Sequence, residues 1–222
     1  MDYNIKTVKS KHYIQNLIEE GEHEHQDFKY QISDARKIAR SISAFANNAG
    51  GRLLVGVKDN GNIVGVESDE EIYMIEQAAK MYCRPPQDVK FSVYRVEGKN
   101  VLKVDIAAAK KRPVMVQEED KRWKAYYRVA DENILADPVH VKIWKSMSSN
   151  AGMSYSEKEH AIVGCVLMHG EVSIEDCMKL AHVSRGAAED AIVGLCRAGV
   201  LDAVYIGGSF RIVPGPESSA EQ

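Results

Sequence analysis

The sequence predicts an α+β protein in which a mixed-sheet domain is followed by a small helical domain. Residues 34–66 have the pattern of a helix, a glycine stop, a buried strand, a tight turn and a second strand. Residues 89–106 alternate apolar and polar side chains on both sides of a turn, as two neighbouring strands do. From residue 156 onward, three helical patterns precede a glycine-centred hairpin. These observations favour an α+β protein over one built on a parallel sheet.

The composition is that of a globular protein. The chain has 222 residues, of which 45% are hydrophobic, and this is enough for more than one core. Residues 1–153 contain 24 Lys and Arg against 22 Asp and Glu, whereas residues 154–216 contain 5 against 8. We therefore expect attraction to a polyanion to come from the first part of the chain.

The hydropathy pattern predicts no membrane segment. No apolar run approaches the roughly 18 residues that cross a bilayer, and the first residues lack the apolar core of a signal peptide. We therefore expect a cytoplasmic protein without membrane contact. The four cysteines form no CxxC pair and lie on apolar helical faces, where a free thiol is usually buried. Neither a disulfide framework nor a zinc site is expected.

The first elements are a helix and a polar extended segment. Residues 11–20 have one apolar face, and the pattern ends at Gly21. The sequence EHEHQDFKY at 22–30 then predicts a polar edge strand. His23 and His25 have a spacing that could hold a metal ion, but no third ligand accompanies them, so the edge strand is favoured.

Residues 34–49 have the clearest helical pattern. Its apolar face consists of Ile38, Ile42, Phe45 and Ala49. The opposite face, which we expect to be outward, consists of Arg36, Arg40, Ser43 and Asn47. Ser33 is expected to cap the start, and Asn48 with the two following glycines is expected to end the helix.

A strand, a turn and a second helix follow. The buried strand LLVGV at 53–57 leads into Asp59-Asn60-Gly61, which predicts a type I′ turn and a return strand. Residues 68–83 then repeat one apolar stripe and end before two prolines. Two further strands, at 89–96 and 101–109, complete this part of the predicted domain.

The first half of the chain resembles the Schlafen-type AlbA domain. The resemblance covers roughly residues 15–140 and rests on three clear stretches of sequence and two weaker matches. These are Asp27-Phe28-Lys29, SAFANNAGG from Ser43, GVKDNGNIVGV from Gly56, RPVMV from Arg112 and YYRVADENILA from Tyr126. Bacterial members of this family are often described as DNA-binding proteins or transcriptional regulators. The resemblance therefore implies nucleic-acid binding, with DNA favoured over RNA. The chain has no GxxxxGK[ST] loop, so ATP is not an expected cofactor.

The resemblance also implies a competing hypothesis. Some eukaryotic Schlafen proteins are metal-dependent nucleases of structured RNA, and their acidic residues correspond here to Glu22, Asp27 and Asp59. Carboxylates of this kind could hold Mg²⁺ or Mn²⁺ and activate water. Glu22 and Asp27 have opposite parity along a strand, so a turn near residues 21–25 is required to bring them together. A binding protein would need no cofactor.

Basic residues give the candidate nucleic-acid contacts. Those of the first domain are Lys29, Arg36, Arg40, Lys110, Lys111, Arg112, Arg122 and Lys124. Several of them, together with Lys121 and Arg128, flank the aromatic residues Trp123, Tyr126 and Tyr127, and such interleaving suits phosphate contact together with base stacking. The alternative is a solvated loop that Glu118, Glu119 and Asp120 partly neutralise.

The predicted boundaries are a first domain at 1–145, a linker at 146–155, a second domain at 156–214 and a tail at 215–222. The second domain resembles a winged helix-turn-helix, in which Arg185 and Arg211 are the candidate DNA contacts. Its acidic balance also fits a protein-interaction role. Apolar residues that exceed what so small a unit can bury predict a homodimer. They are Val163, Val166, Ile192 and Val193.

Overall fold

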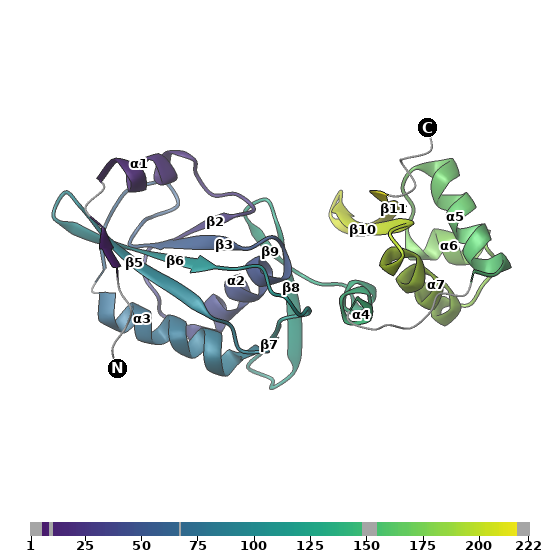
Figure 1. Ribbon diagram of the computed structural model, residues 1–222, viewed down its shortest axis with the longest axis horizontal. Coiled ribbons are helices and arrows are strands. Elements are labelled where there is room, and N and C mark those ends of the chain that lie inside the picture. The colour runs from purple at the N-terminus through teal and green to yellow at the C-terminus, as the bar shows by residue number, and fades with distance from the viewer. Residues whose placement is uncertain (1–5, 9–10, 67, 148–154, 217–222) are drawn as a thin grey trace. The chain divides into compact units, whose positions relative to one another are not determined.

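The computed structural model describes residues 6–8, 11–66, 68–147 and 155–216. The chain divides into two compact units, Met1–Ala136 and Asp137–Gln222. The first unit is α+β, as predicted, and it is built on two sheets. The second unit is mainly helical and ends in a hairpin (Figure 1).

The larger sheet of the first unit has five strands and is mixed. In sheet order these are β1 (Lys6–Val8), β5 (Val89–Val96), β6 (Lys99–Ile106), β3 (Gly51–Val55) and β2 (Gln26–Lys29). The outer pairs β1–β5 and β2–β3 are parallel, whereas the inner pairs are antiparallel. Leu53 and Leu54 of β3 are both buried, on opposite faces of the sheet. Both faces must therefore be covered.

Helices cover the two faces of this sheet. The helical elements of the unit are α1 (Lys11–Glu19), α2 (Ala35–Asn47), α3 (Ser68–Gln77) and the π-helical turn η1 (Ala78–Tyr82). Ile14 and Leu17 of α1 share an apolar cluster with Leu54. Helices α2 and α3 lie on the opposite face, where Ile42 and Ile72 pack with Leu53 (Figure 1).

The second sheet lies against the far side of α2. Its strands are β4 (Cys83–Arg84), β7 (Met115–Gln117), β8 (Trp123–Val129) and β9 (Glu132–Leu135). All three pairings are antiparallel. Because side chains alternate along a strand, Tyr126 and Arg128 point toward α2, whereas Trp123 and Tyr127 point away from it. Helix α2 is thus sandwiched between two sheets.

This arrangement corrects the expected outward face of α2. Ser43 and Asn47 were expected to face outward, yet both are fully buried. Asn47 donates from Nδ2 to the carbonyl oxygens of Val114 and Tyr126, at 3.0 Å each, and its Oδ1 accepts from the Val114 amide at 2.7 Å. The polar stripe therefore contacts the backbone of the second sheet instead of water. The helix is capped by Asp34, which accepts from the Arg36 amide, and not by Ser33.

The turn after β3 also differs from the prediction. A type I′ turn requires positive φ at both central residues. Of Asp59, Asn60 and Gly61, only Gly61 has positive φ, and a single Val57–Ile63 bridge replaces the expected return strand. The β5–β6 connection has the two positive-φ residues instead, at Glu97 and Gly98.

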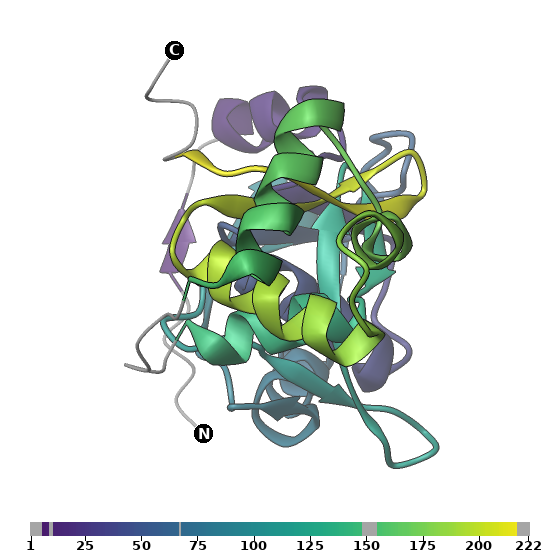
Figure 2. The ribbon, with the colours of Figure 1, turned by 90° about the vertical axis from the view of Figure 1, so that its right-hand side faces the viewer.

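The second unit has four helices and a hairpin in its described part. They are α4 (Pro138–Ser146), α5 (Glu157–His169), α6 (Ile174–Leu180), α7 (Arg185–Arg197), β10 (Leu201–Ile206) and β11 (Ser209–Pro214). The hairpin packs beside α5 and α7 (Figure 2). Val172 adds a bridge to Ile212 of the hairpin. Ser156, Ser173 and Ser184 cap the three helices that follow α4, at the positions that the sequence predicted.

The division of the chain differs from the predicted boundaries. Residues 138–145 were expected in the first domain, but Val139 and Ile143 of α4 belong to the apolar core of the second unit. The expected linker falls mostly on residues 148–154, and the expected tail mostly on 217–222, outside the described residues. All four cysteines are free and buried. Within the described ranges, the helices are too short or too polar to span a membrane.

Candidate functional site

Glu22 and Asp27 can lie together only if a turn separates them, and this turn is present between α1 and β2. The amide and carbonyl of His23 exchange hydrogen bonds with those of Gln26, at 3.0 and 3.1 Å. In such an antiparallel register, the residues that flank this bridged pair are also opposite each other. The flanking residues are Glu22 and Asp27. The turn therefore places both carboxylates on one face, whereas a regular edge strand, as predicted for 22–30, would separate them.

Cationic side chains surround Asp27. Asp27 is only 3% exposed. Lys29 Nζ lies 2.7 Å from Oδ2, and Arg128 Nη2 lies 3.5 Å from Oδ1. Ser41 Oγ donates to Oδ2 at 3.4 Å. Asp27 is therefore a buried ion that two cations already neutralise.

Glu22 has a different environment. Burial raises its pKa to about 7, and a hydrogen bond with Asp27 contributes in the same direction. The amide of Phe28, which donates to Glu22 Oε1 at 2.8 Å, opposes this shift. Glu22 therefore keeps its proton to a higher pH than an exposed glutamate does.

Arg128 is the residue of this cluster that the sequence placed wrongly. It was counted among the cations that flank the aromatic strand, but it is 1% exposed. Its Nη2 donates to the carbonyl of Gln26 at 3.2 Å, and its Nη1 donates to Asn133 Oδ1 at 3.1 Å. Asn48 bonds both the amide and the carbonyl of Arg128, at 3.1 and 2.7 Å. The two asparagines at 47 and 48, which sequence reasoning missed, thus fix β7 and β8 on α2.

The carboxylates do not fit a divalent metal as they are arranged. Hard cations prefer several oxygen ligands that are free to coordinate, whereas Lys29 and Arg128 occupy the carboxylate of Asp27. Asp59, the predicted third acid, is an exposed residue in the turn beside Tyr30 and does not join the pair. Across the described ranges, no three His, Cys, Asp or Glu side chains are grouped as metal ligands. The arrangement is that of a structural ion cluster.

Several predicted phosphate contacts are engaged within the first unit. Arg40 donates from Nε and Nη2 to Glu118, and this bond holds the pKa of Glu118 below its usual range. The Arg36 guanidinium lies 4.8 Å from the ring centre of Tyr82. Arg122 binds Asp120, and Lys29 binds Asp27. These side chains are less available to a phosphate than their spacing indicated.

Two lysines remain accessible in the loop between β6 and β7. Lys110 and Lys111 are exposed, and neither forms an ion pair within the described part of the chain. Arg112, the third basic residue of this loop, donates to the carbonyl of Asn48 and so anchors the loop to the end of α2. We call residues 110–112 the basic loop. Lys124 is half-buried on β8, where its charge is close to Glu118.

An arginine–tryptophan stack lies on the outer face of the second sheet. The Arg84 guanidinium is 4.6 Å from the ring centre of Trp123. Arg84 is exposed and pairs in register with Met115, which follows the basic loop by three residues. The sequence predicted a stacking role for Trp123, Tyr126 and Tyr127 together. Tyr126 instead points inward and donates to Glu118 at 2.6 Å.

The candidate contacts of the second unit are neutralised or half-buried. Arg185, at the start of α7, pairs with Glu175 at 2.9 Å and with Glu189 at 3.0 Å. Glu189 also binds Lys142 of α4. Arg211 is half-buried on β11, opposite Val204. No side chain at the start of α7 thus has the free positive charge that base contact favours.

The fold defines an α+β domain with a central helix between two sheets, and its sequence matches a known family model. The model described as Schlafen, AlbA_2 matches residues 22–137. The chain therefore belongs to the Schlafen AlbA_2 family, as the residues around Asp27, Asn47 and Gly61 predicted. No curated protein matches the chain.

Two solved structures are similar to the chain. The DIP2311 protein from Corynebacterium diphtheriae is 22% identical, with a TM-score of 0.44, over 86% of this chain and 34% of its own. The N-terminal domain of an ATP-dependent DNA helicase RecG-related protein from Nitrosomonas europaea is 16% identical, with a TM-score of 0.37, over 67% of this chain and 97% of its own. This chain spans about a third of the first of these proteins.

Proposed function

We propose that the protein binds nucleic acid through its first unit, and that the contact surface consists of the basic loop and the Arg84–Trp123 stack. The observation that carries this proposal is the accessibility of Lys110 and Lys111, and Arg84 is a further exposed cation, which lies on a partly exposed aromatic ring of the same unit. Lysines without an acidic partner are free to replace the counterions of a phosphate backbone. Membership of the AlbA_2 family is consistent with this role.

The stack supports contact with unpaired bases. An arginine plane that lies on an aromatic ring can receive a base on its other side, and such stacking is tolerant of sequence. Arg84 is held on Trp123 while its other side remains accessible to solvent. The proposed surface therefore favours single-stranded or locally opened segments over a closed duplex.

We further propose that the second unit is a winged helix and that the whole chain is a DNA-binding transcriptional regulator. The order α5, α6, α7, β10, β11 and the Val172–Ile212 bridge support this assignment. The ion pairs of Arg185 favour partner contact over base reading by this unit.

We keep the homodimer as a proposal, but its contact surface consists of residues other than those that the sequence predicted. Val166 and Ile192, expected as surplus apolar surface, are fully buried within the unit. The exposed apolar side chains in the described part of the second unit include Leu167, Met168 and Leu180, and Met168 is 80% exposed. Light scattering of the wild-type chain tests the dimer, and Met168→Glu should dissociate it.

A metal-dependent ribonuclease is the weaker hypothesis. It needs Glu22 and Asp27 as ionised ligands and a third acid near them, whereas Asp59 lies apart and two cations occupy Asp27. Incubation of labelled tRNA with Mg²⁺ or Mn²⁺ tests it directly. Turnover that Asp27→Asn abolishes would replace the binding role by an enzymatic one.

Anisotropy titrations with single-stranded DNA, duplex DNA and RNA over a salt series test the binding role. We expect the double variant Lys110→Ala/Lys111→Ala to weaken binding to every sequence alike and to lower the salt slope by about two, because two phosphate contacts are lost. Arg84→Lys keeps the charge but removes the plane, so it should weaken single-stranded binding roughly fivefold and duplex binding little.

The matched control is Lys158→Ala/Lys179→Ala, which removes two exposed lysines of the second unit. Equal losses in both double variants would indicate a net-charge effect and not a surface. If the basic-loop variant kept the affinity and the salt slope of the wild type, the proposed role of the first unit would be refuted.

A further inference from the structure

The connection between β6 and β7, residues 107–114, is attached to α2 on both sides of the basic loop. Before the loop, the Ala109 amide donates to the Ala46 carbonyl of α2 at 2.8 Å. After the loop, the Val114 amide donates to the Asn47 side chain at 2.7 Å, and the Val114 carbonyl accepts from the same side chain at 3.0 Å. The path of the chain is therefore fixed where it enters the basic loop and where it leaves it.

Gly50 allows the start of this connection to approach the end of α2 closely. It has φ +83°, and a Cβ at this position would lie 2.8 Å from the Ile106 carbonyl oxygen and 2.9 Å from the Ala108 amide nitrogen. A carbon atom that close to backbone atoms would displace the connection. The glycine therefore permits the approach that brings the Ala109 amide to its partner on α2.

Arg112 adds an attachment within the basic loop itself. Its Nη2 donates to the carbonyl of Asn48, the residue at which α2 ends. The last carbonyls of a helix lack a partner inside the helix and lie at the negative end of its dipole, so a guanidinium is favoured there. Arg112 is half-buried, whereas Lys110 and Lys111 are exposed. Arg112 is therefore engaged by the protein, and the two lysines remain accessible to a ligand.

This difference separates the roles of the three basic residues. A loop that is already held in one conformation loses less conformational entropy on binding than a mobile loop does. We propose that Arg112 is a positioning residue, which holds Lys110 and Lys111 in the conformation that contacts a phosphate backbone and does not itself contact a phosphate. This inference rests on the nucleic-acid binding proposed above, and it replaces the phosphate contact that the sequence predicted for Arg112.

Arg112→Met tests this role, because methionine keeps a flexible, unbranched side chain but can neither donate a hydrogen bond nor carry a charge. ¹⁵N relaxation of the free full-length chain should show larger motion at the Lys110 and Lys111 amides than in the wild type. Anisotropy titrations with single-stranded DNA should show roughly fivefold weaker binding, because the loop must then be ordered on binding. The salt slope should equal that of the wild type, since the number of phosphate contacts is unchanged.

Arg112→Lys is the conservative variant. Its ammonium can donate one hydrogen bond to the same carbonyl, so it should recover part of the loop order and part of the affinity. A recovery of both together would support positioning, because a general loss of structure would not respond to this single bond.

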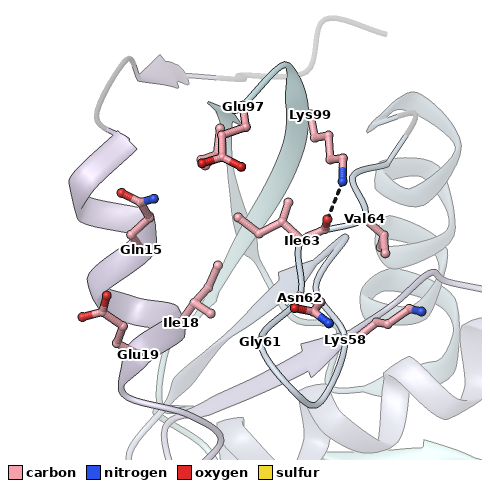
Figure 3. A pocket seen from close by; sticks show the side chains of 11 residues that line it. Gln15, Ile18, Glu19, Lys58, Gly61, Asn62, Ile63, Val64, Glu97 and Lys99 are labelled. Carbon is pink, nitrogen blue, oxygen red and sulfur yellow. Dashed lines mark hydrogen bonds between the residues drawn. The ribbon is translucent and has the colours of Figure 1, made fainter.

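Lys99→Met is the matched control, because Lys99 makes the same kind of contact in another loop. Its Nζ donates to the Ile63 carbonyl at 2.8 Å, in the groove beside α1 (Figure 3). The change removes one positive charge and one bond from a cation to a carbonyl in the same unit, but it leaves the basic loop attached. The motion of the two loop lysines, the affinity and the salt slope should all stay as in the wild type.

Two results would overturn this inference and leave the proposed function intact. One is wild-type affinity in Arg112→Met when Lys110→Ala/Lys111→Ala weakens binding. The other is a salt slope lowered by about one in Arg112→Met with unchanged loop motion, which would make Arg112 a phosphate contact. If the double lysine variant bound as the wild type does, the proposed function would fail and the positioning role with it.

Discussion

The interiors of the two units are stabilised in different ways. In the first unit, α2 lies between two sheets, and buried polar side chains such as Ser43, Asn47 and Arg128 bond the backbone of neighbouring elements. In the second unit, the core between the helices and the hairpin is apolar, and the polar bonds are at helix starts. A buried amide depends on a particular partner, whereas apolar contacts depend mainly on volume. The first unit should therefore tolerate fewer substitutions inside its core.

The largest effect is expected for Asn47→Ala. This change leaves the buried Val114 amide and Tyr126 carbonyl without the partner that Asn47 supplies, and such groups cost roughly 1 to 3 kcal/mol each, so we expect a loss of about 4 kcal/mol. Urea unfolding followed by Trp123 fluorescence in a Trp144→Phe background measures the first unit alone. Asn62→Ala, at an exposed position, is the control. A loss below about 1 kcal/mol would mean that water replaces the amide easily.

A second, slightly smaller effect is expected for Ile192→Ala. Ile192 is fully buried in the apolar core of the second unit, and such truncations cost about 3 kcal/mol. Ile192→Val should cost about 1 kcal/mol, since it removes one methylene. Trp144 fluorescence in a Trp123→Phe background follows this unit. If Ile192→Val and Ile192→Ala cost the same, the contrast between volume-dependent and partner-dependent packing would be lost.

The helix starts allow a finer comparison. Asp34 accepts two backbone amides at the start of α2, as Ser156 does through its capping box at the start of α5. We expect Asp34→Ala and Ser156→Ala each to cost about 1 kcal/mol in their own unit, the usual value for a cap. Ser33→Ala should change stability by no more than about 0.3 kcal/mol, because Ser33 is exposed and does not cap the helix. If Ser33→Ala lowered the stability more than Asp34→Ala did, Ser33 would be the cap, as the sequence predicted.

The smallest effect is a pH dependence of the first unit. The folded pKa of Glu22 is raised from 4.5 to about 7, so the folded state binds its proton more tightly than the unfolded state does. Glu22 therefore contributes most to stability below about pH 4.5, and this contribution is lost as the pH rises to about 7. In Glu22→Gln the decline over this window should be smaller than in the wild type.

Urea unfolding at pH 5 and pH 7.5 measures this difference. Glu24→Gln, in the neighbouring exposed position, should keep the wild-type decline. An unchanged decline in Glu22→Gln would show that Glu22 is ionised in the folded state throughout, and would reopen the pair as a metal site.

Much of the local structure follows from the sequence. The serine caps at 156, 173 and 184 and the glycine pair at 207 and 208 depend on neighbours within a few residues, and the structure places each where the pattern predicted. The requirement for a turn between Glu22 and Asp27 was likewise a local argument from strand parity, and the His23–Gln26 hydrogen bonds satisfy it. Interactions between residues that are close in the sequence can be predicted without knowledge of the fold.

Only the tertiary structure decided which polar residues contact water. Helical periodicity places Ser43 and Asn47 opposite the apolar stripe, but it does not distinguish solvent from the backbone of a second sheet. The partners of Asn47 and Asn48 are 67 to 80 residues away in the chain. The same is true of Arg128, whose charge is matched by Asp27 of a distant strand, and of Asp59, which a short turn keeps apart from the carboxylate pair. These contacts are set by the packing of β7 and β8 on α2, because a polar side chain is satisfied equally well by water or by a correctly placed peptide group.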